Sequence, residues 1–63
     1  MNEDYILQTP INIYGMFFPI GTLYKQVNAD YWNPVVNGAQ LPSYAVHFMI
    51  IKNNETYFKL ITK

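Results

Sequence analysis

Residues 44–52, Tyr-Ala-Val-His-Phe-Met-Ile-Ile-Lys, give the clearest strand signal in the chain and decide the predicted fold. In an extended chain, successive side chains point to opposite faces. One face would carry Tyr44, Val46, Phe48 and Ile50, and the other Ala45, His47, Met49 and Ile51. Both faces are mainly apolar, which is typical of a central strand that is buried on both sides or covered on one side by a partner.

Two further strands are predicted on the N-terminal side of this run. Residues 11–18 are β-branched and aromatic and lie between Pro10 and Pro19. Proline is tolerated at the start of a strand but not in its middle, so these residues bracket a strand. Gly15 inside it indicates a bulge or a close approach of another backbone. Residues 22–28 favour a second strand, and the turn between the two predicts a hairpin.

Shorter signals fill the rest of the chain. Residues 28–34 predict one helical turn that is capped by Asn28 and ended by Pro34. Asn37-Gly38 is a strong hairpin-turn signal, with arms cut short by prolines on either side. Residues 56–62 fit a closing strand or a short helix capped by Asn54, and their Thr, Tyr, Phe and Ile content favours the strand.

Together these signals predict a mainly β chain. The expected architecture is a small curved antiparallel sheet or an SH3-like barrel of four to five short strands, with a short C-terminal helix as the alternative for residues 56–62. Residues 1–9 begin polar and are expected to form a flexible N-terminal segment. Residues 10–63 then form a single small domain, because so short a chain has room for one core only.

Composition indicates that the domain needs a partner surface. A chain of 63 residues buries only about 60% of its unfolded surface. Small domains are usually reinforced by disulfides, a metal or association. The chain has no Cys, and His47 is its only His, so a disulfide and a Cys/His zinc site are excluded. Aromatic residues make up 17% of the chain and charged residues only 13%. We therefore expect an exposed apolar patch and self-association.

The charge balance argues against nucleic acid and membrane partners. The net charge is zero and Arg is absent, whereas nucleic-acid binders draw much of their affinity from neutralising phosphates. Apolar runs at 13–20 and 44–51 are shorter than the roughly 20 residues that span a bilayer. Without a basic N-terminal flank we expect no secretion signal and a cytoplasmic location. Abundant Asn, Ile, Tyr and Lys fit an AT-rich bacterium or its phage, and for a phage protein the host cytoplasm.

No group of residues in the sequence supports catalysis. Ser43 and His47 would lie roughly 13 Å apart on one strand, whereas a nucleophile and its base need contact near 3 Å. Asp30 and Glu55 fall in separate turns and are expected to be solvated or capping groups rather than an acid–base pair. The glycines are isolated, so no phosphate loop is present. We expect no enzyme, no cofactor and no metal.

The aromatic residues around the Asn-Gly turn are the candidate partner-binding site. Trp and Tyr are typical anchors of protein interfaces, and six tyrosines cannot all be buried with satisfied hydroxyls in so small a core. Two alternatives stay open, since Trp32 can instead fill the core and His47 can be a hydrogen-bonded core residue rather than a pH-sensitive contact. The predicted partner-binding residues are Tyr24, Tyr31, Trp32, Asn37, Tyr44 and His47.

These features predict a non-enzymatic protein-interaction module that binds another protein and self-associates, as a phage or bacterial accessory or inhibitor protein would. One alternative is a small barrel that binds single-stranded nucleic acid by stacking, with Lys25, Lys52 and Lys59 as the residues available for its basic groove. A second alternative is an aromatic small-molecule pocket built at an oligomer interface.

Overall fold

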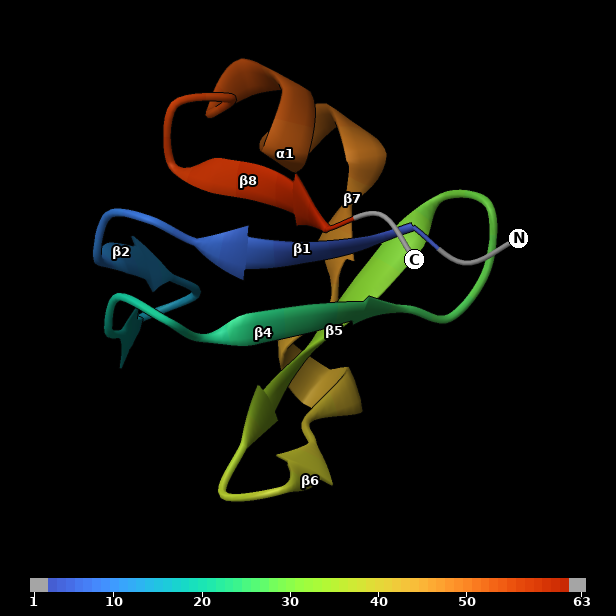
Figure 1. Cartoon of the computed structure of the whole chain (residues 1–63). Coiled ribbons are helices and arrows are strands. Elements are labelled where there is room, and N and C mark those ends of the chain that lie inside the picture. Colours follow the sequence, from blue (N-terminus) through green and yellow to red (C-terminus); the bar gives the residue numbers. More distant parts are fainter. Residues whose placement is uncertain (1–2, 62–63) are drawn as a thin grey trace.

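Six strands form one antiparallel sheet in the computed structural model, which describes residues 3–61. The order across the sheet is β6 (Ala39–Gln40), β5 (Tyr31–Val36), β4 (Leu23–Gln26), β1 (Asp4–Leu7) and β8 (Phe58–Ile61). The first part of β5 also pairs with β7 (Val46–His47). In Figure 1, β8, β1 and β4 run side by side, and β5 runs obliquely behind β4.

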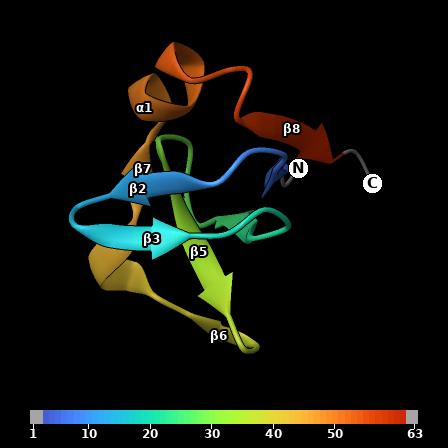
Figure 2. The ribbon, with the colours of Figure 1, turned by 90° about the vertical axis from the view of Figure 1, so that its left-hand side faces the viewer.

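A separate hairpin of β2 (Ile11–Ile13) and β3 (Met16–Phe18) packs beside the sheet (Figure 2). The predicted single strand over 11–18 is therefore wrong, as is its pairing with residues 22–28. Ile13 faces Met16 across a two-residue turn in which Tyr14 and Gly15 both have positive φ, at 53° and 78°. Such turns match the twist of a hairpin. Gly15 thus reverses the chain where we expected a bulge.

The segment 28–34 is not helical. Asn28 Oδ1 accepts hydrogen bonds from the amides of Asp30 and Tyr31, at 2.9 and 3.0 Å, as a capping side chain would. These bonds instead close the loop between β4 and β5, and the chain continues as a strand through Pro34. The Asn-Gly turn is confirmed, since Val36 faces Ala39 and both turn residues have positive φ. The prediction that Pro34 cuts the first arm short is wrong, because β5 runs through this residue.

The predicted central strand over 44–52 is wrong and is replaced by three short elements. A 3-10 helix, η1 (Pro42–Tyr44), begins at a proline, and the two residues of β7 follow. The helix α1 (Phe48–Asn53) then takes up the rest of the apolar run. Over so few residues, periodicity does not separate a strand from a helix that is largely apolar all round.

The N-terminal segment forms the strand β1 between β4 and β8, so the predicted flexibility of residues 1–9 does not hold for residues 4–7. Tyr5 faces Tyr24 on one side and Leu60 on the other. Asp4 is buried, and its Oδ1 accepts a hydrogen bond from the Gln26 amide at 3.1 Å. The strand favoured for 56–62 is confirmed over Phe58–Ile61, where it pairs with β1, while Thr62 lies outside the described residues.

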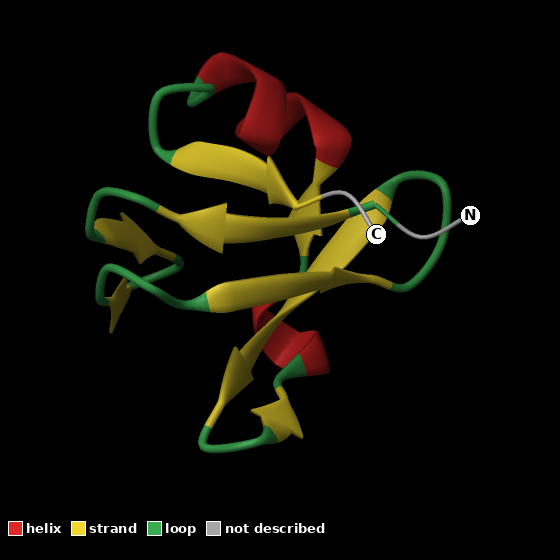
Figure 3. Cartoon of the chain, in the orientation of Figure 1, coloured by secondary structure: helices red, strands yellow, loops and turns green. Residues whose placement is uncertain are grey.

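The core lies between the sheet, the hairpin β2–β3 and α1 (Figures 1 and 3). Its aromatic rings meet edge to face, with centroids 5.2 Å apart for Tyr24 and Phe58 and 5.9 Å for Phe18 and Tyr24. This arrangement suits the ring quadrupoles. The buried members of the core are Leu7, Ile13, Phe18, Tyr24, Trp32, Val46, Ile51 and Phe58.

The fold is therefore mostly β, with an antiparallel sheet of several strands, as predicted. A short helix does lie near the C-terminus, but at Phe48–Asn53 and not in the segment 56–62 for which a helix was the alternative. Of the two predicted architectures, the structure has the open sheet. Among residues 3–61 the strand path ends at β6 on one side and β8 on the other, and no pairing closes it into a barrel. No helix in this part of the chain is long and apolar enough to cross a membrane.

Candidate interaction surface

Two of the six predicted partner-binding residues lie in the core. Tyr24 is 0% exposed and Trp32 is 2% exposed, so neither side chain is available to a partner. The Trp32 indole packs edge to face against Tyr5, and its Nε1 donates a hydrogen bond to the carbonyl of Glu3. Of the alternatives for Trp32, the core role is the one the structure has.

The hydroxyl of Tyr24 is buried without a hydrogen-bond partner among residues 3–61. Burial raises the pKa of this hydroxyl well above its ordinary value, because the phenolate form would lose its hydration without gaining a partner. The strand register places Tyr24 between Tyr5 and Pro34, where its ring packs on Phe58 and Phe18. The packing of the ring therefore holds Tyr24 in the core, and its hydroxyl contributes no hydrogen bond there.

Tyr31 and His47 lie together at the surface, where β5 pairs with β7. Their ring centroids are 5.1 Å apart in an edge-to-face contact, and Tyr31 is 42% exposed. His47 is half-buried and caps α1, since its Nδ1 accepts a hydrogen bond from the Met49 amide at 3.1 Å. A capping acceptor satisfies an amide that has no partner within the helix. The pair is available to a partner while His47 also holds the start of α1.

The remaining two predicted residues are not part of this group. Asn37 is exposed in the turn between β5 and β6. Tyr44 lies in η1, half-buried against the Phe18 ring with centroids 6.0 Å apart. The structure thus brings together Tyr31 and His47 only.

Apart from Val27 in the β4–β5 loop, the exposed large apolar side chains of residues 3–61 fall into two groups. Tyr14, Phe17 and Ile20 project from the hairpin β2–β3 and the segment after it, and we name them the hairpin surface. The second group gathers around the start of α1, where the Phe48 amide donates to the Asp30 carbonyl at 2.8 Å and so ties α1 to the β4–β5 loop. We name this second group the α1 surface, and it comprises Tyr31, His47, Phe48, Met49 and the pocket described next.

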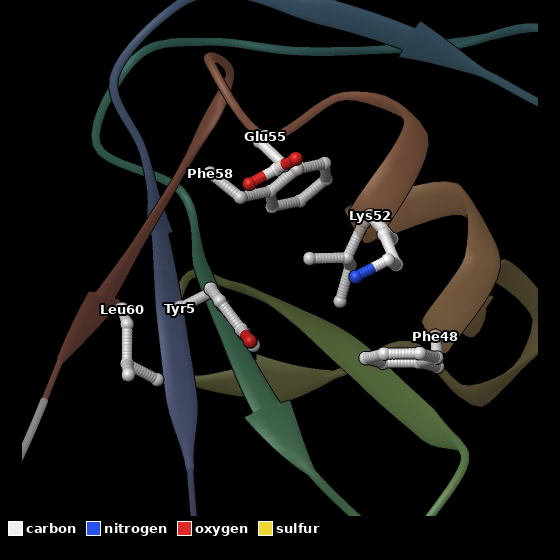
Figure 4. A pocket seen from close by; sticks show the side chains of 7 residues that line it. Tyr5, Phe48, Lys52, Glu55, Phe58 and Leu60 are labelled. Carbon is white, nitrogen blue, oxygen red and sulfur yellow. The ribbon is translucent and has the colours of Figure 1, made fainter.

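A pocket of about 280 Å³ lies between α1 and the strands β1 and β8 (Figure 4). In the close-up, Phe48 and Lys52 stand on the side of α1, and Leu60 stands on the opposite side next to Tyr5. The volume lies just below the about 300–1,000 Å³ of ordinary small-molecule sites, and it suits an anchoring side chain of a protein partner. The lining residues are Tyr5, Phe48, Ile51, Lys52, Glu55, Phe58 and Leu60.

The pocket is mainly apolar, with three aromatic rings and one charge of each sign among its lining residues. The Lys52 ammonium lies 5.9 Å from the centre of the Phe48 ring, within the range of a cation–π contact. Glu55 supplies the negative charge. Burial raises the pKa of the Tyr5 hydroxyl, and the nearby Glu3 carboxylate raises it further. The Tyr5 hydroxyl is therefore neutral at ordinary pH and can donate a hydrogen bond.

The lysines do not share one face of the sheet. Leu60 and Phe58 line the pocket, so Lys59 between them points to the opposite, outer face. Lys59 faces Ile6 and Ile6 faces Leu23, which puts Lys25 on that outer face too. Of the lysines among residues 3–61, only Lys52 lies at this pocket, whereas stacking sites for single strands combine aromatic side chains with a basic groove.

The residues considered for catalysis have structural positions. His47 Nδ1 is occupied by its bond to Met49, and Ser43 lies in η1. Asp30 is in the β4–β5 loop, and Glu55 lines the pocket beyond α1. No cluster of three or more His, Asp or Glu side chains that could hold a metal ion occurs between residues 3 and 61.

Sequence reasoning missed the pocket because its residues come from both ends of the chain. Tyr5 lies in the segment expected to be flexible, and Leu60 lies in the last strand. Only the pairing of β1 with β8 brings them together. The exposure of Phe48 and Met49 was missed because residues 44–52 were predicted to form a buried strand. No protein-family model, curated protein or solved structure matches this chain.

Proposed function

We propose that this chain is a protein-interaction module that works without catalysis and binds its partner through the α1 surface. The partner is another protein or a second copy of the chain, and the module acts as an accessory or inhibitory protein. The observation that carries the proposal is the exposure of Tyr31, Phe48 and Met49 beside an aromatic pocket. Exposed apolar patches of this kind mark interaction sites, and partner anchors enter central pockets.

The α1 surface is favoured over the hairpin surface because it combines apolar exposure with a concave site. An interface gains most of its binding energy from a few side chains that fill well-packed pockets. Lys52 and Glu55 provide the polar rim that such interfaces have around an apolar centre. The hairpin surface, by contrast, exposes Tyr14 and Phe17 on a short two-stranded hairpin, and neither residue lines the pocket.

Affinity capture with paired surface variants tests the proposal. Met49→Asp adds a charge to the α1 surface at a side chain that is 51% exposed, so the fold tolerates it. Tyr14→Asp makes the matched change on the hairpin surface. We expect the wild type and Tyr14→Asp to retain the same partner, and Met49→Asp to lose it. If Met49→Asp keeps every partner of the wild type while Tyr14→Asp loses them, the assignment of the surface is wrong.

A further inference from the structure

The strand β8 forms one end of the main sheet. Among residues 3–61, β8 pairs with β1 on one side and with no strand on the other. An edge strand presents a row of main-chain N–H and C=O groups that can pair with another chain. Its outward groups therefore decide whether a further strand can be added.

The phase of the hydrogen bonds shows which groups face outward. The Gln8 amide donates to the Tyr57 carbonyl at 2.8 Å, so in this antiparallel ladder Tyr57, Lys59 and Ile61 bond to β1. The alternate residues Phe58 and Leu60 then direct their N–H and C=O groups to the open side. These two residues direct four main-chain groups away from β1, two from Leu60, which is 45% exposed, and two from Phe58, which is 5% exposed.

Side chains on the two faces of β8 differ in chemistry. Phe58 and Leu60 lie on the pocket face, and Leu60 is 45% exposed at the rim of the pocket (Figure 4). Lys59 is exposed on the outer face. A strand added antiparallel would place one residue opposite Lys59 in a close, non-hydrogen-bonded pair, and its neighbours would point to the pocket face.

We propose that the open edge of β8 binds an extended segment of a partner protein as an additional antiparallel strand. The segment carries an acidic residue opposite Lys59, and the apolar residues on either side of it pack against Leu60 at the mouth of the pocket. Main-chain bonds to Phe58 and Leu60 supply affinity, and the alternating side chains supply specificity. This inference rests on the proposed function and names the kind of segment that the module captures.

A second copy of β8 is disfavoured at the same edge in the register that joins Phe58 to Leu60. In a two-fold antiparallel pairing that uses the outward groups of both Phe58 and Leu60, Phe58 of each copy bonds to Leu60 of the other. Lys59 would then lie directly opposite Lys59 of the second copy. Like charges in that position destabilise a strand pair, and lysine on an edge is a common defence against self-pairing. The charge of this edge therefore selects an acidic segment of another protein.

A capped synthetic peptide in which phenylalanine alternates with glutamate tests the inference on the full chain by NMR. In the free protein we expect fast amide exchange at Phe58 and Leu60 and slow exchange at Lys59. The peptide should slow exchange at Phe58 and Leu60 in a concentration-dependent way. A peptide N-methylated on the alternate amides that face β8 cannot form the ladder and should not bind. Equal binding of both peptides, or slow exchange at Phe58 and Leu60 in the free chain, would overturn the inference.

Charge exchange provides the matched control. With lysine in place of glutamate, the peptide should bind about threefold to tenfold more weakly. The variant Lys59→Glu should reverse that preference, whereas Lys25→Glu, on the same outer face but within the sheet, should not. If Lys59→Glu leaves the preference unchanged, the assigned register is wrong. Absence of peptide binding refutes the added strand alone, because capture through Met49 is measured independently and can still succeed.

Discussion

At the scale of single residues, Tyr24 shows how apolar packing outweighs a polar cost. Its ring meets Phe18 and Phe58 in the centre of the core, while its hydroxyl has no partner in the described part of the chain. A buried donor without a partner costs about 1–3 kcal/mol. An aromatic side chain truncated in a core costs about 3–5 kcal/mol. The packing energy of the ring therefore outweighs the cost of its buried hydroxyl, and the fold does not need that hydroxyl.

The variant Tyr24→Phe should unfold at a higher urea concentration than the wild type. Removing the unsatisfied hydroxyl and keeping the ring is expected to raise the free energy of unfolding by about 1 kcal/mol. The comparison variant Tyr24→Ala should lower it by about 3–5 kcal/mol. A loss of more than about 1 kcal/mol in Tyr24→Phe would mean that the hydroxyl has a partner in solution.

Alkaline pH should destabilise the chain through the same residue. Because burial raises the pKa of Tyr24 in the folded chain, the unfolded chain releases this proton first. The stability from the neutral hydroxyl is complete below about pH 10, the ordinary pKa of tyrosine, and falls as pH rises toward the folded-state pKa. The slope approaches about 1.4 kcal/mol per pH unit. Urea unfolding at increasing pH should show a steeper loss in the wild type than in Tyr24→Phe, and equal slopes would contradict this reasoning.

At the scale of elements, β1 depends on contacts that are distant in sequence. Only Asp4–Leu7 form it, yet it bonds to β4 on one side and β8 on the other. The Glu3 amide donates to Gln26 Oε1 at 2.7 Å and adds to the attachment of this segment. The segment that was predicted to be flexible therefore connects β4 to β8 within the sheet.

Deletion of residues 1–7 should abolish the fold. The loss of β1 leaves β8 without its neighbour and removes Leu7 from the core. Circular dichroism and amide dispersion of the truncated chain should be those of an unfolded polypeptide. A truncated chain that keeps dispersed amide signals would show that β1 is not an essential part of the sheet.

The elements that were predicted correctly have local causes. The Asn37-Gly38 turn follows from two residues that tolerate positive φ, and β4 and β8 follow from short β-favouring stretches. The helix α1 could not be predicted, because an apolar run of six residues fits a strand as well as a helix, and only tertiary contacts such as Phe48 N to Asp30 O decide between them. Of the candidate site, Tyr31 and His47 were predicted, whereas Tyr5 and Leu60 needed the register of β1 and β8.

At the scale of the whole molecule, apolar side chains are exposed because the chain contains many of them, and not because the fold is loosely packed. The accessible surface is 4205 Å², close to the about 4,200 Å² expected for a folded monomer of this mass. A standard interface covers about 800 Å² of each partner, which is close to one fifth of that area. The α1 surface with the edge of β8 is a contiguous region from which such an interface can be built.

Light scattering after size-exclusion chromatography should detect association of the chain with itself. We expect the measured mass to exceed that of a monomer at high protein concentration and to fall on dilution, because exposed apolar side chains favour association. Met49→Asp should shift the transition to higher concentration, and Tyr14→Asp should not. A monomer at every micromolar concentration, with no binding of a hydrophobic dye, would contradict self-association.

Site-specific photocrosslinking tests the central claim most directly, since it reports which surface another protein covers in the cell. A benzophenone amino acid replaces Met49 on the α1 surface or, in the matched control, Tyr14 on the hairpin surface, two side chains that are 51% and 63% exposed. We predict a crosslinked product, to a second copy or to another protein, from position 49 and none from position 14. Crosslinking from position 14 alone would contradict the account.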